Sequence, residues 1–92
     1  MKVVYKYIVD SQSMHQHIFA VTLPLGTEVL TVQKQGEQTC MWVLQDFQDN
    51  GPFQERRFVK IGTGQPVADT YKYVGTVQEL DGALIWHYFE IL

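Results

Sequence analysis

Hydrophobic and polar residues alternate along most of the chain in short runs, and clusters of glycine, proline and small polar residues interrupt these runs. A period of two places successive side chains on opposite faces of a β-strand, whereas no window keeps the helical period of 3.6. The pattern therefore predicts short strands joined by turns, with at most one short helical turn at 67–70. The expected strands cover residues 2–9, 17–23, 28–35, 38–47 and 56–61, followed by the two arms of a hairpin within 71–92.

The segment 71–92 gives the clearest prediction, because Asp81-Gly82 lies between two β-rich runs. Both central residues of a type I′ hairpin turn need positive φ, and aspartate and glycine tolerate it. The register that follows pairs Val77 with Trp86, Thr76 with His87, and Gly75 with Tyr88. We expect the Tyr88 ring to cover the gap that a glycine leaves in a strand.

The same alternation predicts how the other strands face the core. Leu30 and Val32 are expected to point inward, and the strand at 38–47, apolar on both faces, is expected to be central in a sheet. About seven short strands indicate an all-β fold, an antiparallel meander closing as a small barrel or sandwich.

Length and composition limit this fold to a single domain over residues 1–92, with 46% hydrophobic residues to form a core. A chain this short buries only about 65% of the surface that its unfolded form exposes, so oligomerisation would add useful stability. A net charge of -3 argues against duplex nucleic acid or an anionic membrane as a general partner. Arg56, Arg57 and Lys60 form one local basic spot.

Cysteine and hydropathy patterns favour a cytoplasmic protein. Cys40 is the only cysteine, which excludes an internal disulfide and a cysteine-based zinc site and fits a reducing compartment. We expect Cys40 to be a small buried side chain. No apolar run approaches the ~20 residues that a membrane span needs.

One set of turn and strand residues is spread over nearly the whole chain: Pro24, Gly26, Leu30, Val32, Gln33, Cys40, Trp42, Leu44, Arg57, Phe58, 62–64, Pro66, Tyr73, Gly75, Thr76 and 86–90. This set resembles that of a family of short uncharacterised proteins encoded in phages, prophages and bacterial genomes. The resemblance implies a small phage-encoded accessory protein in a bacterial cytoplasm, and it implies no catalytic residues. Relatives often have histidine where this chain has Gln65, which argues against a metal ligand or general base in that loop.

The Gly62-Thr63-Gly64 segment is the strongest candidate for ligand binding. Glycine-rich turns present backbone N–H groups to anions, although this one lacks the lysine of a P-loop and the third glycine of a dinucleotide site. A turn that needs positive φ is the commoner role. The candidate ligand-binding set comprises Arg57, Lys60, Gly62, Thr63, Gly64 and an aromatic side chain, Trp42 or Trp86.

Histidines and carboxylates do not form a recognisable catalytic or metal site. His15 and His17 lie on one side of a strand but lack a third ligand, so we expect neither a metal nor a cofactor. His87 is expected to be half-buried and hydrogen-bonded to a hydroxyl or carbonyl group. Glu90, opposite Tyr73 in the predicted register, is either an edge charge or one carboxylate of a site.

The last strand is apolar on both faces, so one face either closes a barrel or contacts another molecule. The candidate interface comprises Tyr73, Leu84, Trp86, Tyr88 and Leu92. The first functional hypothesis is a non-enzymatic homo-oligomer that a phage uses to bind and modulate a host protein, such as a defence factor. Sequestration of a small phosphorylated ligand or nucleotide signal is the second hypothesis, and a virion structural or assembly component is the third.

Overall fold

A computed structural model describes residues 1–9, 17–47 and 51–92, and within them the chain forms strands and one short 3-10 turn at Leu80–Gly82. The all-β prediction is confirmed. The strands are β1 Lys2–Ile8, β2 Ile18–Pro24, β3 Glu28–Gln35, β4 Gln38–Asp46, β5 Phe53–Gly62, β6 Lys72–Glu79 and β7 Leu84–Ile91. The helical turn predicted at 67–70 is instead a tight turn, in which the Tyr71 N–H donates to the Ala68 carbonyl at 3.0 Å.

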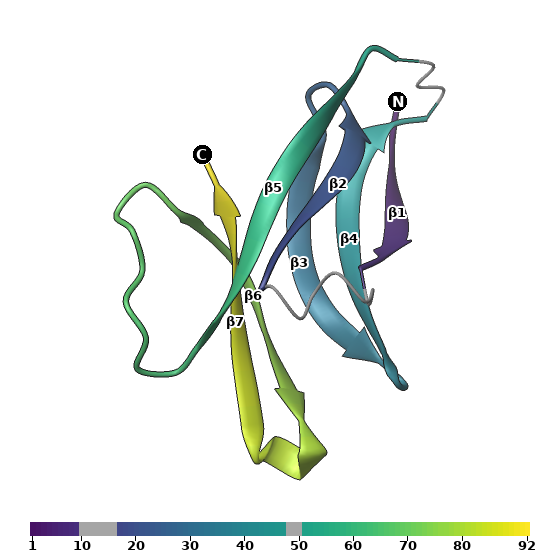
Figure 1. The fold of residues 1–92 in the computed structure, drawn as a ribbon. Coiled ribbons are helices and arrows are strands. Elements are labelled where there is room, and N and C mark those ends of the chain that lie inside the picture. Colours follow the sequence, from purple (N-terminus) through teal and green to yellow (C-terminus); the bar gives the residue numbers. More distant parts are fainter. Residues whose placement is uncertain (10–16, 48–50) are drawn as a thin grey trace.

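The strands form two antiparallel sheets (Figure 1). Sheet A has the order β1-β4-β3, which confirms that β4 is central, and sheet B has the order β2-β5-β7-β6. In the described part of the chain, β3–β4 and β6–β7 are the neighbours that follow each other in sequence. The connectivity therefore departs from a simple meander.

The connection from β5 to β6 joins two strands of sheet B that are separated by a third strand, β7. Both strands pair antiparallel with β7, from opposite sides, so they run parallel to each other. Parallel strands cannot be joined by a tight hairpin, and the chain must return along the sheet. Residues 63–71 make this return, which we call the crossover loop; in Figure 1 it is the wide green loop on the left.

The β6–β7 hairpin has the predicted register from Val77 and Trp86 to Gly75 and Tyr88. Asp81 and Gly82 have φ values of 54° and 89°, and the Ala83 N–H donates to the Leu80 carbonyl at 3.0 Å, as a type I′ turn requires. Beyond Gly75 the ladder shifts at a bulge. The prediction that Glu90 lies opposite Tyr73 is therefore wrong, because Glu90 pairs with Lys72 and Tyr73 pairs with Phe89.

Gly75 lies where the two sheets meet. A Cβ atom at Gly75 would lie 2.4 Å from the Val32 carbonyl oxygen and 2.8 Å from the Val32 nitrogen, both on β3. The predicted explanation for this glycine, a gap covered by the Tyr88 ring, is thus corrected: the backbone of β3 occupies the space. The absence of a side chain allows β6 of sheet B to approach β3 of sheet A.

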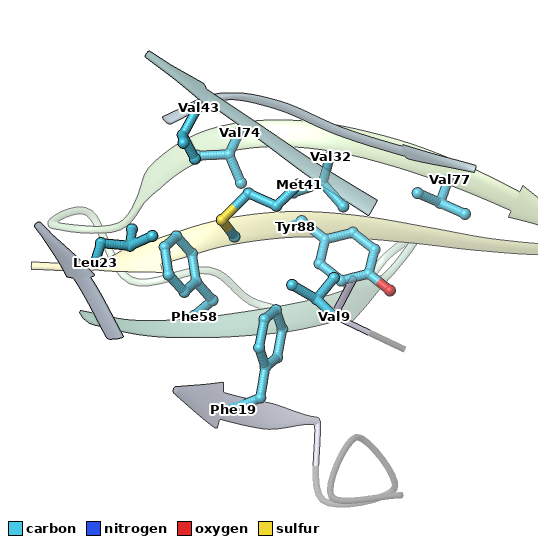
Figure 2. Packing of buried hydrophobic residues seen from close by; sticks show 10 residues of the cluster. All are labelled: Val9, Phe19, Leu23, Val32, Met41, Val43, Phe58, Val74, Val77 and Tyr88. Carbon is cyan, nitrogen blue, oxygen red and sulfur yellow. The ribbon is translucent and has the colours of Figure 1, made fainter. Parts of the chain in front are cut away.

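The core lies between the sheets and contains side chains from all seven strands or their ends (Figure 2). Figure 2 shows Phe58 and Tyr88 between Phe19 and Met41, and Tyr88 is only 2% exposed. Each large apolar side chain buried here contributes about 1.5–3 kcal/mol. The cluster comprises Val9, Phe19, Leu23, Val32, Met41, Val43, Phe58, Val74, Val77 and Tyr88.

Leu30 departs from the predicted pattern, since it is 42% exposed rather than inward. The β3–β4 register shifts between Val29 and Thr31, so a bulge inserts one residue into the alternation. Val29 packs against the core in place of Leu30, and Val32 is inward as predicted.

Arg56 and Glu90 form an ion pair within the fold, with side chains 15% and 6% exposed. The guanidinium donates to both carboxylate oxygens, at 2.6 and 2.8 Å, and also to the Thr27 carbonyl. The hydrogen bond to Glu90 raises the pKa of Arg56 above its ordinary value, although burial acts in the opposite direction. Glu90 lies on β7, a central strand, so its predicted role as an edge charge is wrong.

Candidate functional site

A cleft of about 520 Å³ opens at the edge of β5, beyond the point where β2 begins. The first β2–β5 pair joins Ile18 and Val59, so Lys60, Ile61 and Gly62 extend past the start of β2. The crossover loop forms the other wall. The cleft is lined by His17, Ile18, Val59, Lys60, Ile61, Gly62, Gln65, Pro66, Tyr71 and Trp86.

Strand pairing brings Lys60 and Trp86 together. Lys60 lies opposite Tyr88, and Gly62 lies opposite Trp86, so the lysine and the indole are diagonal neighbours on one face of sheet B. The Lys60 ammonium nitrogen lies 4.5 Å from the centroid of the Trp86 ring, which is a cation–π contact. The indole N–H is buried and has no acceptor among the described residues.

His17 closes the cleft from the start of β2. Its carbonyl accepts a hydrogen bond of 2.9 Å from the Lys60 N–H, and its ring centroid lies 5.0 Å from that of Trp86. Its φ of 69° is uncommon for a residue with a side chain. His15, which the sequence places on the same side of a strand as His17, lies outside the described residues.

The Gly62-Thr63-Gly64 segment is a strand-to-loop turn, the commoner of its two predicted roles. The Gln65 N–H donates to the Gly62 carbonyl at 3.1 Å, and Gly64 has a φ of 90°. Gly62 lines the cleft, and a Cβ there would lie 3.8 Å from Gln65 and 3.9 Å from Trp86. Thr63 is exposed and instead contacts His87.

His87 lies on the outer face of sheet B and is hydrogen-bonded through both ring nitrogens. Its Nε2 lies 2.8 Å from the Thr63 hydroxyl, and its Nδ1 lies 3.1 Å from the Thr76 hydroxyl. Thr76 also shares a hydrogen bond of 2.6 Å with the Tyr73 hydroxyl. The prediction of a half-buried, hydroxyl-bonded histidine is confirmed, and this chain of hydrogen bonds ties the crossover loop to β7 and β6.

The predicted ligand set is only partly assembled. Lys60 and Gly62 meet Trp86 in the cleft, but Arg57 lies on the opposite face of β5, opposite Ile91. Trp42 is also distant in the fold, in sheet A between Lys6 and Thr31. The structure adds Tyr71 and Pro66, which the crossover loop brings to Lys60, and His17, which the pairing of β2 with β5 brings there. Local sequence patterns did not connect these residues.

The predicted interface is divided between the inside and the outside of the fold. Tyr88 is a core side chain, so its predicted place in an interface is corrected, and Trp86 belongs to the cleft. Tyr73, Leu84 and Leu92 remain exposed. On the outer face of β7, Phe89 is half-buried and contacts Tyr73 with ring centroids 5.6 Å apart.

A second exposed apolar surface lies on the outer face of sheet A. Val4 and Ile8, on the edge strand β1, are 56% and 55% exposed, and their ladder partners on β4 are Leu44 and Cys40. Trp42 lies between these partners and is half-buried. Because antiparallel partners share a face, these side chains form one surface, which we call the sheet A surface, defined by Val4, Ile8, Trp42 and Leu44.

The described residues contain no group of three or more histidine, cysteine, aspartate or glutamate side chains placed to hold a metal ion. No helix in this part of the chain has the length and apolar character needed to span a bilayer. Cys40 is buried, as predicted.

Residues 1–91 match the family model described as "Domain of unknown function (DUF7352)", and the chain belongs to this family. No curated protein and no solved structure matches the chain.

Proposed function

We propose that this member of the DUF7352 family is a small non-enzymatic accessory protein, encoded by phages or prophages, that binds and modulates a protein of its bacterial host. The resemblance to phage-encoded proteins supports the context. The sheet A surface supports the mode of action, in which a rigid β scaffold covers part of the partner. Self-association through the same surface would give the homo-oligomer expected for so short a chain.

The observation that carries the proposal is the exposure of Val4 and Ile8 beside Trp42. An antiparallel sheet commonly has one face on the core and a polar face toward water, but here the outward face of sheet A carries Val4, Ile8, Trp42 and Leu44, with Lys6 between Val4 and Ile8. Tryptophan is enriched at the energetic centres of protein interfaces. Lys6 lies within this surface, opposite Trp42, and donates to Gln35 at 2.6 Å, and Thr31 lies on the other side of Trp42.

The edge of sheet A also favours a protein partner. β1 pairs with β4 on one side and has no strand on its other side in the described part of the fold. An edge strand offers unpaired backbone donors and acceptors to a strand from another chain. The apolar surface and the free edge adjoin on β1, so one partner segment can use both.

The polar groups of the fold support a non-enzymatic role. The hydroxyl–imidazole pair of Thr63 and His87 continues to Thr76 and Tyr73, so no carboxylate orients the histidine. The buried carboxylate of Glu90 is bound by Arg56 through both oxygens. Neither arrangement presents an activated nucleophile.

The test compares single lysine substitutions on the two sheets. Val4→Lys and Ile8→Lys place a charge in the sheet A surface, whereas Tyr73→Lys changes an equally exposed position on sheet B, 56% exposed like Val4. Tagged proteins are used to capture partners from bacterial lysate, and light scattering after size exclusion gives the oligomeric state. We expect the Val4→Lys and Ile8→Lys variants to bind the partner, or to self-associate, at least tenfold more weakly than the wild type. The Tyr73→Lys variant should bind and self-associate as the wild type does.

Folding is checked by circular dichroism and thermal unfolding, since exposed substitutions should change stability by only about 0.5 kcal/mol. The proposal fails if the wild type is monomeric and captures no specific protein. It also fails if Tyr73→Lys abolishes an interaction that Val4→Lys preserves, because the contact would then lie on sheet B.

A further inference from the structure

We infer that the cleft between β5 and the crossover loop binds a small organic anion with a planar, apolar body, of the class represented by nucleoside monophosphates. The site is separate from the sheet A surface, so the two proposals succeed or fail independently. Its volume of about 520 Å³ is within the range of roughly 300–1,000 Å³ that small-molecule sites occupy.

The charge of the cleft is uncompensated. Among the described lysine and arginine side chains, Lys34, Arg56 and Lys60 are the half-buried ones. Lys34 pairs with Glu79 and Arg56 pairs with Glu90, but Lys60 has no carboxylate within ion-pair distance in the described residues. Its nearest identified partner is the face of the Trp86 indole. A half-buried ammonium group without a counter-ion favours an anionic ligand.

Trp86, which lines the cleft, also has an unpaired indole N–H. The Trp86 N–H is the one buried side-chain polar group without a partner in the described part of the chain. No aspartate or glutamate lines the cleft. A buried donor without an acceptor is unfavourable, so a shift of the surrounding side chains that lets a ligand oxygen reach the indole N–H would remove that cost.

The remaining walls define the body of the ligand. Ile18, Val59, Ile61 and Pro66 are apolar, and Tyr71 and Trp86 add aromatic surfaces. Gly62 lies opposite Trp86, so the strand leaves room beside the indole where a side chain would fill it. Aromatic side chains beside a cation recognise a planar group that carries an anion.

The test uses AMP and the fluorescent anion 1-anilinonaphthalene-8-sulfonate, with adenosine and inorganic phosphate as partial ligands. Calorimetry on the wild type measures affinity. Trp42→Phe leaves Trp86 as the only tryptophan, so its fluorescence locates the bound probe. We expect saturable quenching of Trp86 fluorescence by both planar anions. Adenosine, which lacks the anionic group, and phosphate, which lacks the planar group, should each bind at least tenfold more weakly than AMP.

Two matched variants separate the cleft from general charge effects. Lys60→Gln should weaken AMP binding about tenfold, which corresponds to the loss of one charge-assisted contact. Arg57→Gln removes the same charge from the other face of the same strand and should change the affinity less than twofold. Lys60→Arg keeps the charge and should retain binding.

The inference is overturned if neither planar anion quenches Trp86 at millimolar concentration, or if adenosine binds as tightly as AMP. Equal losses in Lys60→Gln and Arg57→Gln would also overturn it. The comparison of ligands uses the unaltered cleft, so it decides the question even if Lys60→Gln does not fold.

Discussion

At the scale of single residues, alternation along β5 separates three neighbouring cations that look like one basic spot in the sequence. Arg56 points inward to Glu90, Arg57 points to the opposite face, and Lys60 enters the cleft. The period of two already implies that Arg57 and Lys60 cannot face the same ligand. The burial of Arg56 could not be predicted from the sequence, because it depends on Glu90 and the Thr27 carbonyl, which are distant in the chain.

Arg56→Met should destabilise the protein by about 3–5 kcal/mol, because it leaves the Glu90 carboxylate buried without its partner. Lys2→Met, which removes an exposed ion pair with Asp46, should change the free energy of unfolding by only about 0.5 kcal/mol. Urea unfolding measures both. Combining Arg56→Met with Glu90→Leu should recover most of the loss, and a cost for Arg56→Met no larger than that for Lys2→Met would contradict this account.

At the scale of elements, local sequence was enough for the β6–β7 hairpin and insufficient for the crossover loop. Asp81-Gly82 specifies both the turn and the register, so Thr76 and His87 were placed correctly. The Gly62–Pro66 segment reads as an ordinary turn, and nothing near it shows that β5 pairs with β7 rather than with β6. The lining that the loop brings to the cleft was therefore missed.

His87→Ala should loosen the crossover loop, because His87 bridges Thr63 to Thr76. We expect amide hydrogens of residues 63–71 to exchange at least about tenfold faster, as the loss of hydrogen bonds lowers the cost of local opening. Gln33→Ala, which removes an exposed hydrogen bond to Thr31 in sheet A, is the control and should leave these amides unchanged. Unaltered exchange at 63–71 in the His87 variant would refute the bridging role.

At the scale of the whole molecule, the two sheets are joined where β3 and β6 approach at Val32 and Gly75. The all-β class, seven strands and central position of β4 followed from alternation and turn residues. The choice of a sandwich over a barrel and the strands that form each sheet did not, because they depend on pairings between distant strands such as β1 with β4 and β2 with β5. A glycine inside a strand indicated a close contact, but not which strand made it.

Gly75→Ala should cost about 3 kcal/mol, since its methyl group would overlap the Val32 backbone, which cannot move as a side chain can. Gly26→Ala is the matched control: Gly26 has a φ of 84° with open space around it, so only backbone strain of about 1 kcal/mol applies. Chemical unfolding compares the two. A Gly75 variant as stable as the Gly26 variant would show that the sheets tolerate a wider separation.

The position of β7 between β5 and β6 also sets an order of events during synthesis. Both neighbours leave the ribosome before residues 84–91, so β5 has only β2 beside it, and β6 has no neighbour in sheet B, until those residues emerge. The edges of β5 and β6 that face β7 therefore stay unpaired during this time. Sheet B is completed only after β7 has been translated. Contacts this distant in sequence slow folding, so the nascent chain would benefit from a chaperone during that interval.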